Sequence, residues 1–160
     1  MLAGSVLTLF SGCGFHLKGA HQAGSASIYP VYENISPPFK REFHQLLVEN
    51  GQLAINSESA DINLRFLKES WQKQSLSVAD NGIPAEYRLR YTISYRYKKR
   101  SAGDVDNVEQ HQEITESRDF TSNNSQLLAI ESEQAILKQQ IQQRVGLQII
   151  RQLNQIKLIK

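Results

Sequence analysis

Cys13 is the only cysteine of this chain, and its surroundings point directly to chemistry. A short apolar run, Met1–Phe10, leads up to it, and the small residues Ser11 and Gly12 stand immediately before it. This pattern resembles a lipobox, the sequence at which bacterial lipoproteins are acylated on the cysteine thiol and cut just before that residue. A lone cysteine also excludes a disulfide within the chain. We therefore predict that Cys13 is lipidated and becomes the first residue of the mature protein.

The segment around Cys13 departs from the usual lipoprotein pattern in two ways. Phe10 stands where leucine is usual, and the basic region that normally opens a signal peptide is missing. We expect residues 1–12 to be a lipoprotein signal peptide that is truncated or has its true translation start further upstream. The alternative is that Cys13 is a small buried residue of an N-terminal core element.

The residue after the cysteine bears on the membrane that the anchor would select. Gly14 stands where aspartate would retain a lipoprotein in the inner membrane of many Gram-negative bacteria. Two or three acyl chains anchor a protein stably, since each buried methylene contributes about 0.8 kcal/mol. We expect a lipid anchor at the periplasmic side of the outer membrane.

Other reactive residue types do not form a recognisable site. The four histidines are His16, His21, His44 and His111. Their spacing is not that of metal ligands, and no phosphate-binding glycine loop, HExxH or CxxC motif is present. Glu113, Glu116 and Asp119 are the best candidates for a catalytic acid pair, but carboxylates on a polar strand are usually solvated or matched with arginine. The sequence gives no positive case for an enzyme, a metal site or a cofactor.

The stretch Ala85–Lys99 is the strongest structural signal of the chain. Its tyrosines, leucine and isoleucine alternate with arginine, threonine, serine and lysine over twelve residues. A period of two with many aromatic residues is typical of a strand in a sheet with one dry face and one wet face. The remaining elements must supply partner strands and a cover for the dry face.

The pattern on the N-terminal side predicts one strand, one helix and a longer strand. Ser27–Tyr32 reads as a strand that lies at a sheet edge or is bent at its proline, Pro30. Ser36 followed by two prolines predicts a helix start, and Asn50-Gly51 predicts its end. In Asp61–Val78 every second residue is apolar at first, but the same positions become polar in the middle of the segment. Trp71 belongs to the alternate positions. Either a bulge re-phases this strand, or the hairpin extends past the helices and has no dry face there.

The C-terminal side completes the expected architecture. Asn81-Gly82 predicts a tight turn into the central strand, Val108–Thr121 a further antiparallel strand, and residues 126–155 a long helix with an apolar stripe. We predict an α+β fold, a two-layer sandwich of order β-α-β-β-β-α. Its four-stranded, mostly antiparallel sheet is covered on one face by two helices. Residues 13–24 form a lipidated linker, and residues 25–160 form a single domain.

Charge and hydropathy exclude two classes of partner. The formal net charge is only +2, and basic residues are interleaved with acidic ones, so no stripe for nucleic acid is expected. No apolar run reaches the length of about 18 residues that a spanning helix needs.

Three segments resemble the lipopolysaccharide-assembly lipoproteins, the LptE family. Cys13–Gly19 is similar to the segment that opens the mature family members. Asn81–Tyr87 is similar to their turn into the central strand, and Ser117–Phe120 stands before the last helix as it does there. The order of elements agrees, and the resemblance spans nearly all of Cys13–Ile156.

The resemblance implies a role in the cell envelope. Members of the family sit as a plug inside the large outer-membrane β-barrel LptD, help it fold, and bind lipopolysaccharide on its way to the cell surface. The polar surfaces expected here suit a polar barrel lumen. The alternative is a lipid-anchored module that binds another envelope ligand, such as peptidoglycan, without a barrel partner.

The resemblance also directs attention to basic residues that would bind lipopolysaccharide. The family's basic positions match Asp80 and Ile130 here, and neither is basic. Their task would pass to other cations of the two long strands, whose heads could meet lipid phosphates. These cations are Lys68, Lys73, Arg88 and Arg90. Cross-strand pairing of the arginines with Glu109 and Glu113 is the alternative.

Overall fold

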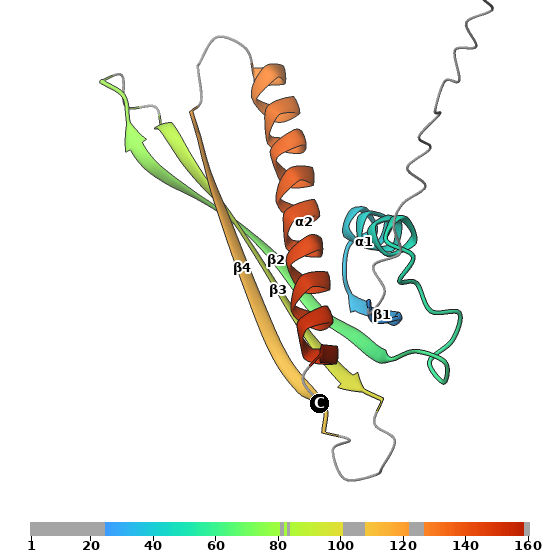
Figure 1. Cartoon of the computed structure of the whole chain (residues 1–160). Coiled ribbons are helices and arrows are strands. Elements are labelled where there is room, and N and C mark those ends of the chain that lie inside the picture. The colour runs from blue at the N-terminus through green and yellow to red at the C-terminus, as the bar shows by residue number, and fades with distance from the viewer. Residues whose placement is uncertain (1–24, 81, 83, 101–107, 122–126, 159–160) are drawn as a thin grey trace, which may run out of the picture.

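The computed structural model describes residues 25–80, 82, 84–100, 108–121 and 127–158, and these form two layers (Figure 1). The order of elements is the predicted β-α-β-β-β-α. The elements are β1 (Ile28–Asn34), α1 (Pro37–Glu49), β2 (Ile62–Val78), β3 (Pro84–Lys99), β4 (Gln110–Thr121) and α2 (Leu127–Leu158).

The sheet has the strand order β1-β2-β3-β4. β1 pairs with β2 in parallel, and the other two pairings are antiparallel. The prediction that the first strand lies at an edge is therefore confirmed. β2 and β3 form a long hairpin whose far end runs beyond α1, so that only α2 accompanies it there (Figure 1).

A bulge in β2 decides which side chains face the helices. Phe66 pairs with Tyr95, but the next paired residue is Lys68, opposite Ser94, so Leu67 is the extra residue. The phase of β2 changes at this point, and Trp71 comes to lie opposite the buried Tyr91. The bulge is thus one of the two alternatives that the sequence left open. An unshifted period of two would place Trp71 on the face opposite the first apolar residues of the strand, and the bulge brings it to the helix side instead.

The core lies between the helices and the tyrosine-bearing face of β3, as the alternation predicted. Tyr91 and Tyr95 are fully buried. The Phe66 ring packs edge-on against Phe39 and Phe43 of α1, with ring centres 5.2 and 4.9 Å apart. The stripe of α2 closes the other half of this core with the buried residues Ile141, Val145, Ile149 and Leu153.

The ends of α1 fall where the sequence places them. Ser36 is the N-cap residue and proline occupies the first turn, although the Ser36 hydroxyl makes no capping hydrogen bond. Asn50 is the C-cap, and Gly51 adopts a φ of 63°, which favours glycine because it has no Cβ. The two helices approach closely, since a Cβ at Gly146 of α2 would lie 2.7 Å from a methyl carbon of Leu46.

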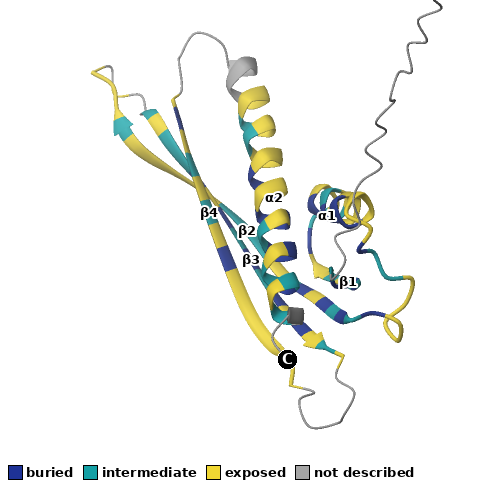
Figure 2. Cartoon of the chain, viewed as in Figure 1, coloured by how far each residue is buried: buried dark blue, intermediate teal, exposed yellow. Residues whose placement is uncertain are grey.

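Exposure is distributed unevenly over the two layers. Figure 2 shows exposed residues along β4, at the end of the hairpin and on the outward side of α2, whereas buried residues gather where the layers meet. Among the described residues, no helix combines the length and apolar character needed to cross a bilayer. The predictions for residues 1–12, for the linker 13–24 and for Cys13 lie outside the described residues.

Candidate functional site

The open sheet face is the face of the sheet that the helices leave uncovered. On β3 it carries the residues that alternate with the buried ones: Arg88, Arg90, Thr92, Ser94 and Arg96. β2 adds Lys68, which pairs with Ser94, and β4 adds Asp119, which pairs with Arg88. Three of the four cations predicted to meet phosphates, Lys68, Arg88 and Arg90, therefore share this face.

Arg88 is held by a neighbour on this face. Its Nε and Nη2 donate hydrogen bonds of 2.7 Å each to the two carboxylate oxygens of Asp119. The hydrogen bond to the guanidinium lowers the pKa of Asp119, and the same contact raises the pKa of Arg88. Arg88 is thus paired with an acid across the strands, but the partner is Asp119 and not the predicted Glu109 or Glu113. Glu109 lies 3.5 Å from Arg96 instead, and Glu113 lies opposite Ser94.

Lys68 and Arg90 differ from Arg88 in this respect. Both are exposed, and neither makes an ion pair within the described part of the chain. Arg90 lies between Gln72 and Ser117 across the strands, and Lys68 is separated from Glu113 by Ser94. Small polar side chains thus surround two charged groups that remain available to an anion.

Lys73 lies on the opposite face of the sheet. It pairs with the buried Leu89, and its Nζ stands 4.0 Å from the centre of the Tyr87 ring and 5.5 Å from that of Phe120. These two rings stack at 5.4 Å. Lys73 therefore engages an aromatic pair, and the four predicted cations do not form one site.

The two positions that match the family's basic residues are located as follows. Asp80 is exposed at the end of the hairpin, where the Gly82 N–H donates to the Ala79 carbonyl. Ile130 belongs to the first turns of α2, and its side chain is outside the described set.

The structure does not assemble the acids considered for catalysis. Glu116 pairs with the buried Tyr91 and lies on the helix side, 3.8 Å from Arg118 and 3.7 Å from Arg144. Asp119 and Glu113 lie on the open sheet face instead. Within the described residues no group of three metal-binding side chains comes together, and His44 and His111 are exposed.

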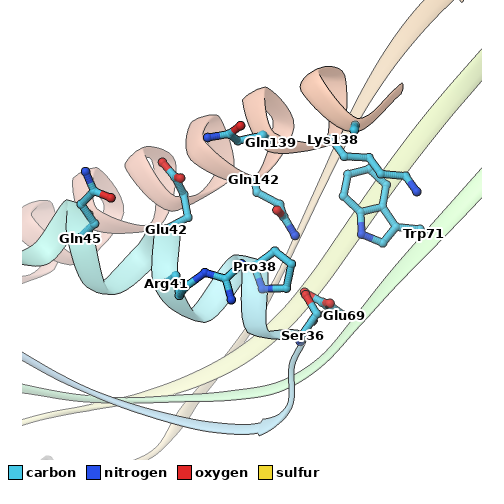
Figure 3. A pocket seen from close by; sticks show the side chains of 11 residues that line it. Ser36, Pro38, Arg41, Glu42, Gln45, Glu69, Trp71, Lys138, Gln139 and Gln142 are labelled. Atoms are coloured by element: carbon cyan, nitrogen blue, oxygen red, sulfur yellow. Dashed lines mark hydrogen bonds between the residues drawn. The ribbon is translucent and has the colours of Figure 1, made fainter. Parts of the chain in front are cut away.

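A second candidate site is the cleft between the two helices, which sequence reasoning missed. This inter-helix cleft has a volume of about 660 Å³ and is bounded by the start of α1, the middle of α2 and the bulged part of β2 (Figure 3). Glu69 and Trp71 of β2 reach it from the sheet, and Lys138 and Gln142 reach it from α2. The signal that could have revealed it was the bulge, which brings Glu69 and Trp71 to the helix side.

Glu69 of β2 links the start of α1 to β3 beside this cleft. Its Oε1 accepts a hydrogen bond of 3.0 Å from the Ser36 N–H, and its Oε2 accepts one of 2.8 Å from the Tyr91 hydroxyl. Burial, followed by this hydrogen bond to Glu69, raises the pKa of Tyr91. Tyr91 therefore stays a neutral donor, and Glu69 is fixed in orientation.

Comparison with known proteins gives one matching family. The model of the family described as LptE, lipopolysaccharide-assembly, matches residues 24–153. The LPS-assembly lipoprotein LptE of Pectobacterium atrosepticum is 26% identical over 157 residues, which are 96% of this chain and 83% of that protein. The protein of the same name from Photorhabdus laumondii is 27% identical over 165 residues, with the same coverage.

Solved structures share the fold. The rare lipoprotein B from Shewanella oneidensis superposes with a TM-score of 0.70 at 18% identity, covering 82% of this chain and 96% of that one. A minor lipoprotein from Acinetobacter baumannii gives 0.63 at 16% identity and covers 82% and 92%. The α+β architecture is thus one that other bacterial lipoproteins adopt.

Proposed function

The chain belongs to the LptE family of lipopolysaccharide-assembly lipoproteins, and from this premise we propose that it plugs an LptD-type outer-membrane β-barrel. In this role it assists assembly of the barrel and helps deliver lipopolysaccharide to the cell surface. The family is one of envelope assembly and is not known as an enzyme family. The partners of the proposed role are the barrel, lipopolysaccharide and, through the lipid on Cys13, the outer membrane at its periplasmic side.

The observation that supports the plug most directly is the polar open sheet face. Its central strand presents arginine, threonine and serine outward, while the tyrosine-bearing side is closed by the helices. The exposed large apolar residues lie scattered over several elements, at positions such as Val31, Ile55, Ile136 and Leu147. A domain enclosed by a polar barrel lumen needs such an exterior, since a large apolar patch would find no apolar surface to pack against there.

Within this role, Lys68 and Arg90 are the residues that we propose for contact with lipopolysaccharide phosphates. They are exposed on one face and form no ion pair with any residue that the structure describes. Their cationic heads can form charge-assisted hydrogen bonds with phosphate oxygens. Arg88 is held by Asp119, and Lys73 by its aromatic pair. These two would contribute less.

Affinity capture from detergent-solubilised outer membranes tests the barrel partnership. The tagged full-length protein should bring down a large β-barrel in a stable complex. Recovery of the protein as a clean monomer would contradict the proposal.

The phosphate contact is tested separately with purified protein and lipopolysaccharide. The double variant Lys68→Ala/Arg90→Ala should bind about a hundredfold or more weakly, because each of the two lost charged hydrogen bonds costs about 1.5–3 kcal/mol. The variant Arg144→Ala/Arg151→Ala removes the same charge from the exposed side of α2 and should bind as the wild type does. Equal losses in the two double variants would show that only net charge matters.

The second candidate function is an envelope-binding module without a barrel partner, for which the inter-helix cleft gives a specific site. Depletion in cells separates the two functions. Loss of lipopolysaccharide from the cell surface supports the plug, and a cell-wall defect alone supports the module.

A further inference from the structure

The inter-helix cleft has the chemistry of a carbohydrate site, and we propose that it binds one neutral sugar ring of an envelope glycan. The cleft lies on the helix side of the sheet, away from the open sheet face and its cations. Its volume of about 660 Å³ falls within the range of 300–1,000 Å³ that small-molecule sites occupy. The cleft combines one aromatic platform, a set of planar polar side chains and a balanced charge.

Trp71 supplies the aromatic platform. Its ring centre lies 4.4 Å from that of the buried Tyr91, which fixes the half-buried indole in place. The ammonium of Lys138 stands 5.6 Å from the indole centre, near the outer limit of a cation–π contact, and Lys138 is exposed (Figure 3). This flexible side chain can yield to a ligand. The C–H face of a pyranose is flat and apolar enough to pack on such a ring.

Hydrogen-bonding groups surround this platform on several sides. Each carboxylate oxygen of Glu69 accepts one hydrogen bond from the protein and keeps a further lone pair for a ligand hydroxyl. Gln142, which is only 6% exposed, bonds to Tyr91 and is directed into the cleft (Figure 3). Gln139 and Gln45 stand at the rim with further amide groups. The Glu69 carboxylate can accept hydrogen bonds from sugar hydroxyls, and the glutamine amides can both donate to and accept from them.

Charge and lining argue against the other components of a glycolipid. Two cations, Arg41 and Lys138, are balanced by two anions, Glu42 and Glu69, so the cleft offers no net attraction to phosphate. Only three lining residues, Trp71, Pro38 and Ala135, have apolar side chains, so an acyl chain would find few apolar groups to pack against. A neutral molecule rich in hydroxyl groups fits both conditions.

The source of the sugar depends on the role of the protein. If the proposed function holds, the ring belongs to the saccharide part of lipopolysaccharide; in the module function it belongs to peptidoglycan. The carbohydrate chemistry of the cleft is common to both. The identification with lipopolysaccharide rests on the proposed function, whereas the sugar site itself does not.

Trp71 makes the inference directly testable because it is the only tryptophan of the chain. The full-length protein in detergent is titrated with N-acetylglucosamine, with delipidated and dephosphorylated lipopolysaccharide saccharide, and with the disaccharide of peptidoglycan. A saturable change in tryptophan fluorescence is expected with at least one probe, with a dissociation constant on the order of millimolar. The probe with the lowest constant identifies the source. Inorganic phosphate should give no change.

Variants connect the fluorescence change to the cleft. Glu69→Gln keeps the shape of the side chain and should raise the dissociation constant about tenfold. Gln139→Ala is an exposed substitution that leaves the fold in place and should raise it several-fold. The matched control, Lys68→Ala/Arg90→Ala on the open sheet face, should titrate as the wild type does. For Trp71→Phe, calorimetry replaces fluorescence and should show weaker binding.

Three results would overturn the sugar site. One is the absence of a saturable change with all three saccharides, and another is a response to phosphate alone. The third is equal binding by the wild type, Gln139→Ala and Trp71→Phe. Failure of the proposed function shows itself elsewhere, in barrel capture and in the effect of Lys68→Ala/Arg90→Ala on lipopolysaccharide binding.

Discussion

Arg88 and Asp119 form a bidentate ion pair on the open sheet face, and this pair changes a pKa that can be measured. Because the guanidinium stabilises the carboxylate, the pKa of Asp119 is lowered. The pair therefore stabilises the fold above the usual carboxyl pKa of about 3.9. This contribution is lost as the pH falls through the lowered pKa of Asp119.

We expect the titration midpoint of Asp119, followed by carboxyl NMR, to lie below the usual aspartate range and to return to it in Arg88→Gln. The matched control is Arg90→Gln, which removes a charge two residues away on the same face and should leave the midpoint low. An Asp119 midpoint that is the same in the wild type and in Arg88→Gln would contradict the role of this contact.

The positions of the individual cations show what the sequence could predict about single side chains and what it could not. Alternation along Ala85–Lys99 places Arg88 and Arg90 on the wet face, and the structure agrees. Alternation alone does not separate a paired arginine from an unpaired one, because that depends on register across β4. The sheet face on which Lys73 lies was harder to predict, since it depends on the bulge at Leu67.

Gly146 of α2 faces α1 at close range, which limits the size of the side chain that fits between the two helices. A Cβ at this position would lie 2.7 Å from Leu46 Cδ1 and 3.4 Å from Phe43 Cδ2. Alanine requires only that the end of the leucine side chain move, whereas valine adds branches against both neighbours.

We expect Gly146→Val to destabilise the domain by about 1–3 kcal/mol, as overpacked cores do. Thermal unfolding should then begin roughly 2–12 °C lower. Gln143→Val, on the exposed side of the same helix, controls for the helix propensity of valine and should cost only some tenths of a kcal/mol. Equal melting temperatures of the two variants would mean that the helices can move apart freely.

The elements themselves were largely predictable, and the exceptions have physical reasons. Strong local signals gave α1, from its serine, prolines and terminal glycine, and β3, from its alternation. The interrupted alternation in β2 suggested a bulge, but the sequence could not decide between a bulge and a hairpin without a dry face. The bulge is stabilised by the packing of Trp71 on Tyr91 of the neighbouring strand. The inter-helix cleft followed from the bulge and was therefore missed.

At the scale of the whole molecule, the anchor and the folded domain are proposed to be separate. We expect Cys13→Ser to leave the domain folded and to release it from the membrane fraction, since the acyl chains would be lost while the core residues are unchanged. Cell fractionation measures the release, and circular dichroism checks the fold. Mass spectrometry of the wild-type mature protein should find an acylated Cys13 as its first residue.

Two other results would change this interpretation. A Cys13→Ser protein that still sediments with the outer membrane would indicate attachment through the barrel alone. An unmodified first residue in the mature wild-type protein would contradict the prediction of a lipid anchor.

The two outer strands of the sheet differ in how they face a neighbouring molecule. β1 is short and contains Pro30, a residue tolerated mainly at sheet borders. Within the described residues, β4 leaves one border unpaired over its 12 residues, and it carries acidic groups at Glu113, Glu116 and Asp119. Exposed borders invite further strands to add on, and charged side chains oppose this. The acidic side chains of β4 therefore disfavour its pairing with a strand from a second copy of the chain.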